Sequence, residues 1–113
     1  MNEIPECHPY AQMLKEAPVA ILVCCYSDLQ SGEFGVQDCS AATQNILLAA
    51  HAKGLGAVWL GVYPAESLVM ATKKLLNLPE HIIPISLISI GYPAEQKPRQ
   101  DRCRADRVHY NQW

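Results

Sequence analysis

Hydrophobic residues along the chain gather in five blocks, which alternate between the spacing of strands and the spacing of helices. The runs at 18–26, 57–63 and 82–90 predict strands. The first is short, branched and apolar at successive positions, which predicts burial on both faces, and the second is also expected to be buried. The two longer segments between these runs carry apolar residues at helical spacing. Taken alone, the order strand, helix, strand, helix, strand predicts parallel strands joined by helical crossovers.

Glycine, proline and asparagine mark the ends of the two predicted helices. The first helix begins near Val36 and ends at Gly54, which can adopt the left-handed conformation of a helix C-terminus. Apolar residues cover nearly its whole surface, more than a lone chain of this size would bury, which favours association with a second copy. The second helix begins at Pro64 and ends at Asn77. The segment 27–35, before the first helix, has the composition of a loop.

Length and composition predict one domain without a strong charge. The 113 residues are 50% hydrophobic, which is enough for one core, so we expect a single domain over residues 1–113. A net charge of −2 argues against binding to nucleic acid or an anionic membrane through bulk charge. No apolar run approaches the roughly 20 residues of a transmembrane helix. The first residues lack the basic and apolar parts of a signal peptide, so a cytoplasmic location is expected.

Cysteine, histidine and serine form no catalytic or metal-binding motif in this sequence. The five cysteines lack Cys-x-x-Cys spacing, and Cys24 and Cys25 lie in an apolar run, where a thiol behaves as a small hydrophobic side chain. No histidine has a partner four residues away, so no metal site is predicted. Ser40 and Ser67 lack the flanking glycines of a nucleophile elbow. The Gly54-Leu55-Gly56 stretch follows a helix and enters a strand, which is the reverse of a dinucleotide-binding turn.

Basic residues near the C-terminus provide a further candidate site. Five cations stand against two aspartates in this part of the chain: Lys97, Arg99, Arg102, Arg104 and Arg107. A guanidinium group can hold a phosphate through two parallel hydrogen bonds. A solvated charged surface has the same composition, so the residues alone leave both interpretations open.

A series of segments in a fixed order gives the chain a family resemblance. The stretch 38–64 joins the apolar helix to the second strand, and it is followed by Leu78-Pro79-Glu80, by the strand at 85–93 ending in Gly-Tyr-Pro, and by Arg102. Together these segments resemble the FMN-dependent nitroreductase family. The resemblance implies an α+β fold with a mixed, mostly antiparallel sheet and surrounding helices, in place of a parallel sheet. It also implies a homodimer with FMN at the subunit interface, in which residues 94–113 form a tail or an extension exchanged with the partner.

The same resemblance implies where the cofactor lies. Trp59, Leu60 and Gly61 match the strand end beside the isoalloxazine ring, where the backbone amide of Gly61 would face flavin N5. Glycine permits such a close approach. Arg102 matches the family's phosphate-binding arginine, and Arg99 is the second candidate. No side chain is expected to act as a catalytic acid or base, because the flavin carries the chemistry.

The implied activity is reduction of a small planar acceptor, a nitroaromatic or quinone-like compound, in a ping-pong reaction. NAD(P)H would deliver a hydride to FMN and leave before the acceptor takes the electrons. The basic and flavin-lining segments that usually begin a family member have no counterpart here, so the chain resembles an N-terminally truncated member. The alternative is therefore a flavin-poor, non-enzymatic nitroreductase-like subunit that still dimerises.

Overall fold

The computed structural model describes residues 4, 8, 10–27 and 34–113 and shows a small α+β fold. Along the chain its elements are η1 (Gln12–Lys15), β1 (Val19–Tyr26), α2 (Phe34–Ala52), β2 (Gly56–Gly61), α3 (Glu66–Leu75), β3 (Ile82–Gly91) and η2 (Ala105–Arg107). The three predicted strands and two predicted helices all form, with ends within a few residues of those expected. Most of the predicted loop, residues 28–33, lies outside the described residues. None of the described helices is both long and apolar enough to span a bilayer.

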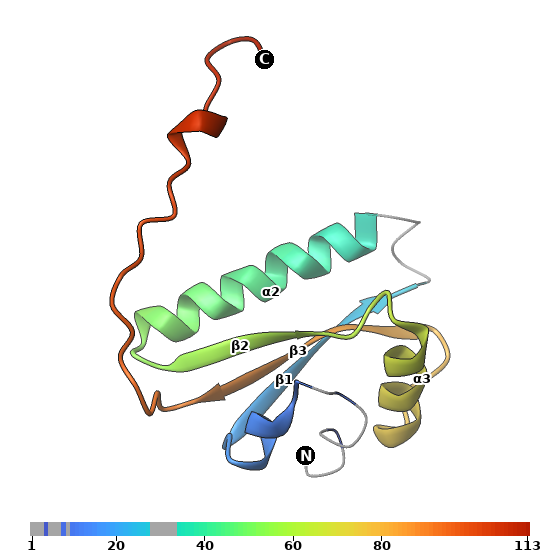
Figure 1. The fold of residues 1–113 in the computed structure, drawn as a ribbon. Coiled ribbons are helices and arrows are strands. Elements are labelled where there is room, and N and C mark those ends of the chain that lie inside the picture. The colour runs from blue at the N-terminus through green and yellow to red at the C-terminus, as the bar shows by residue number, and fades with distance from the viewer. Residues whose placement is uncertain (1–3, 5–7, 9, 28–33) are drawn as a thin grey trace.

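The three strands form one antiparallel sheet in the order β1-β3-β2 (Figure 1). Because β3 is antiparallel to both neighbours, β1 and β2 run in the same direction, and α2 crosses between them as the hydrophobic pattern predicted. The prediction of a parallel sheet was nevertheless wrong, because β3 inserts between these two strands. The mostly antiparallel sheet implied by the family resemblance is confirmed.

A bulge near its start allows the central strand β3 to contain a proline. Proline is normally confined to the start of a strand or to an edge strand, because it has no N–H for the sheet. Pro84 is buried and pairs with Cys24, whereas the neighbouring Val23 pairs with Ser86. Ile85 is therefore an extra residue without a partner in β1. This bulge shifts the register where the proline cannot donate a hydrogen bond.

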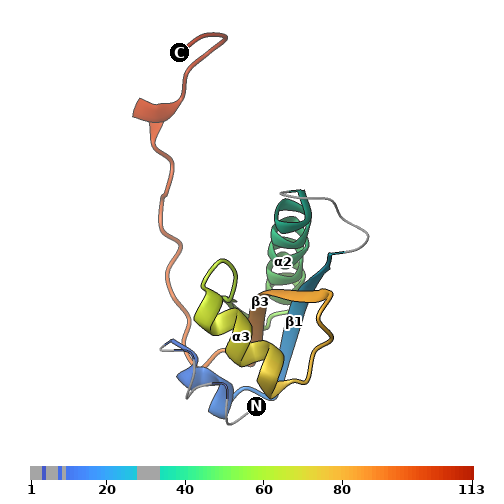
Figure 2. The same ribbon diagram turned by 90° about the vertical axis from the view of Figure 1, so that its right-hand side faces the viewer.

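Helix α2 covers one face of the sheet, and α3 with η1 covers the other (Figure 2). On the α2 face, the hydroxyl groups of Thr43 and Ser86 lie 2.7 Å apart, and both residues are fully buried. The opposite face carries the larger apolar cluster, made of Ile4, Ala11, Leu14, Leu60, Val62 and Leu87. Leu68 and Leu75 of α3, which lie on the same face of the helix, pack against it. The core therefore fixes β2 from the η1 and α3 side.

Left-handed residues end both helices, as predicted. Gly54 has a φ of 72° and Asn77 a φ of 49°. In each case the next amide donates to a carbonyl five residues earlier: Leu55 to Ala50 at 3.0 Å, and Leu78 to Lys73 at 2.9 Å. These bonds satisfy carbonyl groups at the end of a helix, and the first of them directs the chain into β2.

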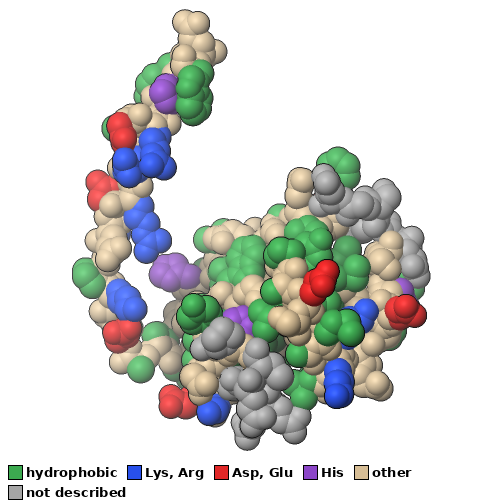
Figure 3. Space-filling model, turned by 45° about the vertical axis from the view of Figure 1, so that its right-hand side comes forward, with side chains coloured by type: hydrophobic (Ala, Val, Ile, Leu, Met, Phe, Trp, Pro, Cys, Tyr) green, Lys and Arg blue, Asp and Glu red, His purple; other side chains and the backbone are tan. Residues whose placement is uncertain are grey.

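Residues 92–113 extend away from the rest of the molecule and are exposed throughout (Figures 1 and 3). The radius of gyration, 16.5 Å, exceeds the roughly 13 Å of a compact chain of this length. The extension leaves the sheet after Gly91, which pairs with Gly56 at the start of β2. It therefore begins at the end of β2 opposite to Gly61.

Candidate functional site

The open edge of β2 ends at Gly61, the residue expected to face the flavin. Gly61 pairs with Ser86 of β3. The next residue, Val62, points its amide toward β3 and donates to the Ile85 carbonyl at 3.1 Å. Backbone groups of successive residues point to opposite sides of an antiparallel strand, so Gly61 directs its N–H and its C=O away from β3. Since β2 is an edge strand of the described sheet, both groups lie on its open side.

Gly61 stands in space that the described residues leave empty. A Cβ atom at this position would meet none of their atoms within 4 Å, and the backbone is outside the left-handed region that favours glycine. The fold therefore gives no steric reason for a glycine here. An outward N–H beside a position without a side chain suits a flat ligand that lies close to the backbone. These features fit the flavin ring that the family resemblance places at Gly61.

A buried histidine from the N-terminal segment holds the other backbone group of Gly61. His8 Nε2 lies 3.0 Å from the Gly61 carbonyl oxygen, and His8 Nδ1 accepts the Tyr10 amide at 3.3 Å. Because Nδ1 is the acceptor in the second bond, Nε2 carries the proton and donates to Gly61. The sequence pattern gave no sign of His8, because this histidine has no partner at metal-ligand spacing and its bond to Gly61 spans 53 residues of sequence.

Trp59 and Leu60 lie near the end of β2, on opposite faces of the sheet. Leu60 is 4% exposed and belongs to the core cluster on the η1 and α3 face. Its side chain is therefore structural, and only its backbone is available to a ligand. Trp59 pairs with Ile88 and is 37% exposed, which leaves part of its indole free to contact a ligand or a partner.

Arg99 and Arg102 lie on the extension and not beside β2. They border one shallow hollow together with Gln100, Asp101 and Cys103. Neither arginine forms an ion pair within the described part of the chain, whereas Arg104 binds Asp106 at 2.9 Å. That bond raises the pKa of Arg104 and lowers the pKa of Asp106. The charges of the two predicted phosphate ligands are therefore not paired with an acidic group in the described residues. The extension that carries them leads away from the sheet of its own chain (Figure 1).

The thiols near α2 have the properties of core side chains. Burial raises the pKa of Cys24 and of Cys39, with a further contribution from Cys25 nearby. These two thiols stay protonated at neutral pH and are poor nucleophiles. Over the residues that the structure describes, no group of three or more His, Cys, Asp or Glu side chains is arranged to bind a metal ion.

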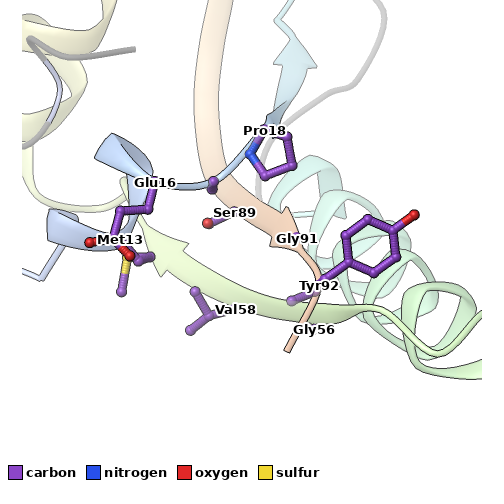
Figure 4. Close-up of a pocket in the computed structure, with 10 residues that line it drawn as sticks. Met13, Glu16, Pro18, Gly56, Val58, Ser89, Gly91 and Tyr92 are labelled. Atoms are coloured by element: carbon purple, nitrogen blue, oxygen red, sulfur yellow. The ribbon is translucent and has the colours of Figure 1, made fainter. Parts of the chain in front are cut away.

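An open pocket of about 560 Å³ lies at the other end of β2, between η1, β2 and β3 (Figure 4). Met13 and Glu16 border it on one side, and Val58 and Ser89 come from the sheet. None of the five predicted site residues lines this pocket. It lies along β2 from Gly56 to Val58, so its nearest lining residue on this strand is roughly 10 Å from Gly61.

Comparisons with known proteins identify the family. The model of the nitroreductase family matches residues 3–92. A protein of Methanothermobacter thermautotrophicus, provisionally named NADH dehydrogenase/NAD(P)H nitroreductase, is 55% identical over 114 residues, which cover all of this chain. A crystal structure with the same provisional name, from Parabacteroides distasonis, matches 99% of this chain with a TM-score of 0.92 and 41% identity. The chain belongs to the nitroreductase family.

One related structure was solved with a bound cofactor. A provisionally named nitroreductase of Desulfovibrio desulfuricans, in complex with FMN, matches 99% of this chain and 65% of its own, with a TM-score of 0.78 and 31% identity. The chain spans 60% of the length of the Methanothermobacter relative and 66% of the Parabacteroides structure. The nitroreductase-like α+β fold is thus confirmed over the part of the family that this chain covers.

Proposed function

We propose that the protein is an FMN-dependent NAD(P)H oxidoreductase that reduces nitroaromatic or quinone-like acceptors in a ping-pong reaction. Gly61 carries this proposal. Among the residues that the structure describes, none accepts from its outward N–H or fills the space beside it, whereas a flavin ring would use both. Membership of the nitroreductase family and the related structure with FMN support the choice of cofactor.

Three residues of β2 would form one side of the flavin site. The Gly61 amide would donate to the ring, the backbone of Leu60 would hold that amide in the sheet, and the exposed part of Trp59 would limit the space around the ring. When bound, FMN supplies the redox chemistry, since it takes a hydride from NAD(P)H and passes electrons to the acceptor. The chain's own residues then bind, orient and exclude water, and none is assigned as an acid or base.

Arg102 and Arg99 would hold the cofactor phosphate from a second subunit. Both belong to the exposed extension, which leads away from the rest of the molecule (Figure 3). Exposed apolar side chains support a homodimer with the flavin at its interface. Leu48 of α2 is 57% exposed, and Tyr110 and Trp113 at the end of the extension are 83% and 102% exposed. Such side chains favour burial against a partner.

The absorption spectrum of the purified protein tests the proposal. We expect the visible flavin bands at close to one FMN per chain after incubation with FMN and gel filtration. We also expect the loaded protein to oxidise NADH or NADPH when a quinone is present. If no flavin stays with the protein and no NAD(P)H is oxidised, the chain is a flavin-poor subunit and the proposal is wrong.

A further inference from the structure

We infer that His8 is a positioning residue for the flavin, because it fixes the backbone of Gly61 from the open edge of β2. The inference rests on the proposed function. His8 is 7% exposed, and both of its ring nitrogens are hydrogen-bonded. Nδ1 accepts from the Tyr10 amide, and Nε2 donates to the Gly61 carbonyl at 3.0 Å. The ring therefore has one tautomer and one orientation.

These bonds hold the peptide group between Gly61 and Val62 at both ends. His8 binds its carbonyl oxygen, and the Ile85 carbonyl accepts from its N–H at 3.1 Å. Glycine otherwise rotates more freely than other residues, and Gly61 is exposed at the end of an edge strand. Fixing this peptide restricts rotation about the Gly61 backbone dihedrals, so the preceding Leu60–Gly61 peptide, which carries the Gly61 N–H, keeps its outward direction before a ligand binds. A donor that is already oriented loses less entropy on binding.

The interaction connects the N-terminal segment to the site. The described residues before β1 otherwise contribute core side chains such as Ala11 and Leu14. His8 alone among these residues forms a side-chain hydrogen bond to the end of β2. A buried histidine that serves stability alone could bind any nearby polar group. His8 instead binds the carbonyl of Gly61, the residue whose N–H would face the flavin.

Two substitutions at His8 separate positioning from packing. His8→Phe keeps an aromatic ring but removes the donor, whereas His8→Gln keeps an amide N–H at nearly the position of Nε2. We expect His8→Phe to weaken FMN binding about five- to tenfold in a fluorescence titration, which corresponds to one lost hydrogen bond. We expect His8→Gln to bind within about twofold of the wild type, and the spectrum of bound FMN to change only in His8→Phe.

Thr43→Val provides the matched control. It also removes a buried hydrogen bond near this strand end, because its partner Ser86 pairs with Gly61 in the sheet, but it leaves both hydrogen bonds of the Gly61–Val62 peptide in place. We expect it to lower stability and to leave FMN affinity unchanged. If His8→Phe does not fold, His8→Asn takes its place, because its shorter side chain does not reach the Gly61 carbonyl.

The outcomes distinguish this inference from the proposed function. If the wild type binds FMN and His8→Phe binds it equally well with the same spectrum, the role of His8 is wrong and the flavin site stands. If the wild type binds no FMN, both are wrong. Nitrogen NMR of the wild-type histidine ring gives a readout without flavin: a proton on Nε2 is expected, and a proton on Nδ1 alone would overturn the inference.

Discussion

Gly61 occupies a position where this chain has room for a side chain. No atom of the described residues lies within 4 Å of an added Cβ, and the backbone is not left-handed. We therefore expect Gly61→Ala to fold as stably as the wild type, with a free energy of unfolding that is unchanged or up to about 1 kcal/mol higher. The increase would come from the unfolded chain, which alanine restricts more than glycine does. A methyl group would nevertheless stand where the flavin ring approaches. We expect FMN affinity to fall at least tenfold in a titration, whereas equal affinity with unchanged stability would remove Gly61 from the site.

Arg102 differs from Arg104 in having no ionic partner in the described part of its own chain. If it binds the FMN phosphate, Arg102→Ala removes a charge-assisted hydrogen bond worth about 1.5–3 kcal/mol, which weakens binding roughly ten- to a hundredfold. Arg104→Ala is the control, because it removes the same charge from the same extension but breaks only an exposed pair with Asp106. An FMN titration of both variants shows which arginine binds the phosphate. If Arg104→Ala loses more FMN affinity than Arg102→Ala, the match of the tail to the family is wrong.

Single residues of the candidate site were predictable from sequence to different degrees. Gly61 follows an apolar strand within a family-like segment, so its position at a strand end could be predicted. The role of His8 could not be predicted, because its bond to Gly61 joins residues 53 positions apart and depends on the tertiary fold. The direction of the Gly61 N–H depends on the register with β3, which the sequence pattern also leaves open.

At the scale of elements, one buried hydrogen bond joins α2 to the central strand. The Thr43 hydroxyl donates to the Cys39 carbonyl at 2.7 Å, so the Ser86 hydroxyl must donate to Thr43 Oγ1. Thr43→Val leaves the Ser86 hydroxyl buried without this partner. We expect it to lower the free energy of unfolding by about 1–3 kcal/mol in urea denaturation. The double variant with Thr43→Val and Ser86→Ala should lose less free energy of unfolding than the sum of the losses in the two single variants.

Ser40→Ala is the comparison for this prediction. The Ser40 hydroxyl also donates to a helix carbonyl, that of Val36 at 2.7 Å, but it is half-buried and has no partner in the sheet. A change below about 0.5 kcal/mol is expected there. Equal losses in Ser40→Ala and Thr43→Val would mean that the contact between α2 and β3 adds nothing to stability.

The elements themselves were predictable, but their arrangement was not. Apolar runs and the left-handed residues Gly54 and Asn77 locate strands and helix ends through local chemistry. Strand order depends on contacts between distant segments, and here β3 enters between β1 and β2 although it comes last. The parallel prediction failed for this reason. The family resemblance corrected it, because it carries information about the whole fold that periodicity does not contain.

At the scale of the molecule, the predicted site residues lie in two separate places. The end of β2 carries Gly61, and the extension carries Arg99 and Arg102, with no contact between these regions in one chain (Figures 1 and 2). The extension adds nothing to the buried core of its own chain, because residues 92–113 are exposed throughout. A single flavin site built from both regions therefore needs the extension of a second copy. The proposed homodimer follows from this separation.

Mixed dimers provide a test of this arrangement. In a dimer that exchanges extensions, each site takes Gly61 from one subunit and Arg102 from the other. A heterodimer of a Gly61→Ala chain and an Arg102→Ala chain would then contain one site with both substitutions and one site with neither. Random assembly makes about half of the dimers mixed, so roughly a quarter of all sites should regain wild-type FMN affinity after co-expression.

The measurement is a flavin titration of the co-expressed protein, compared with each variant expressed alone. Recovery of a tight-binding fraction near one quarter is expected only if the two regions meet across the interface. If Gly61 and Arg102 belonged to the same subunit's site, every site in the mixture would carry one substitution and no tight fraction would appear. Sedimentation of the same samples is the control for assembly, because a stable monomer at micromolar concentration would exclude any site shared between subunits, however the flavin binds.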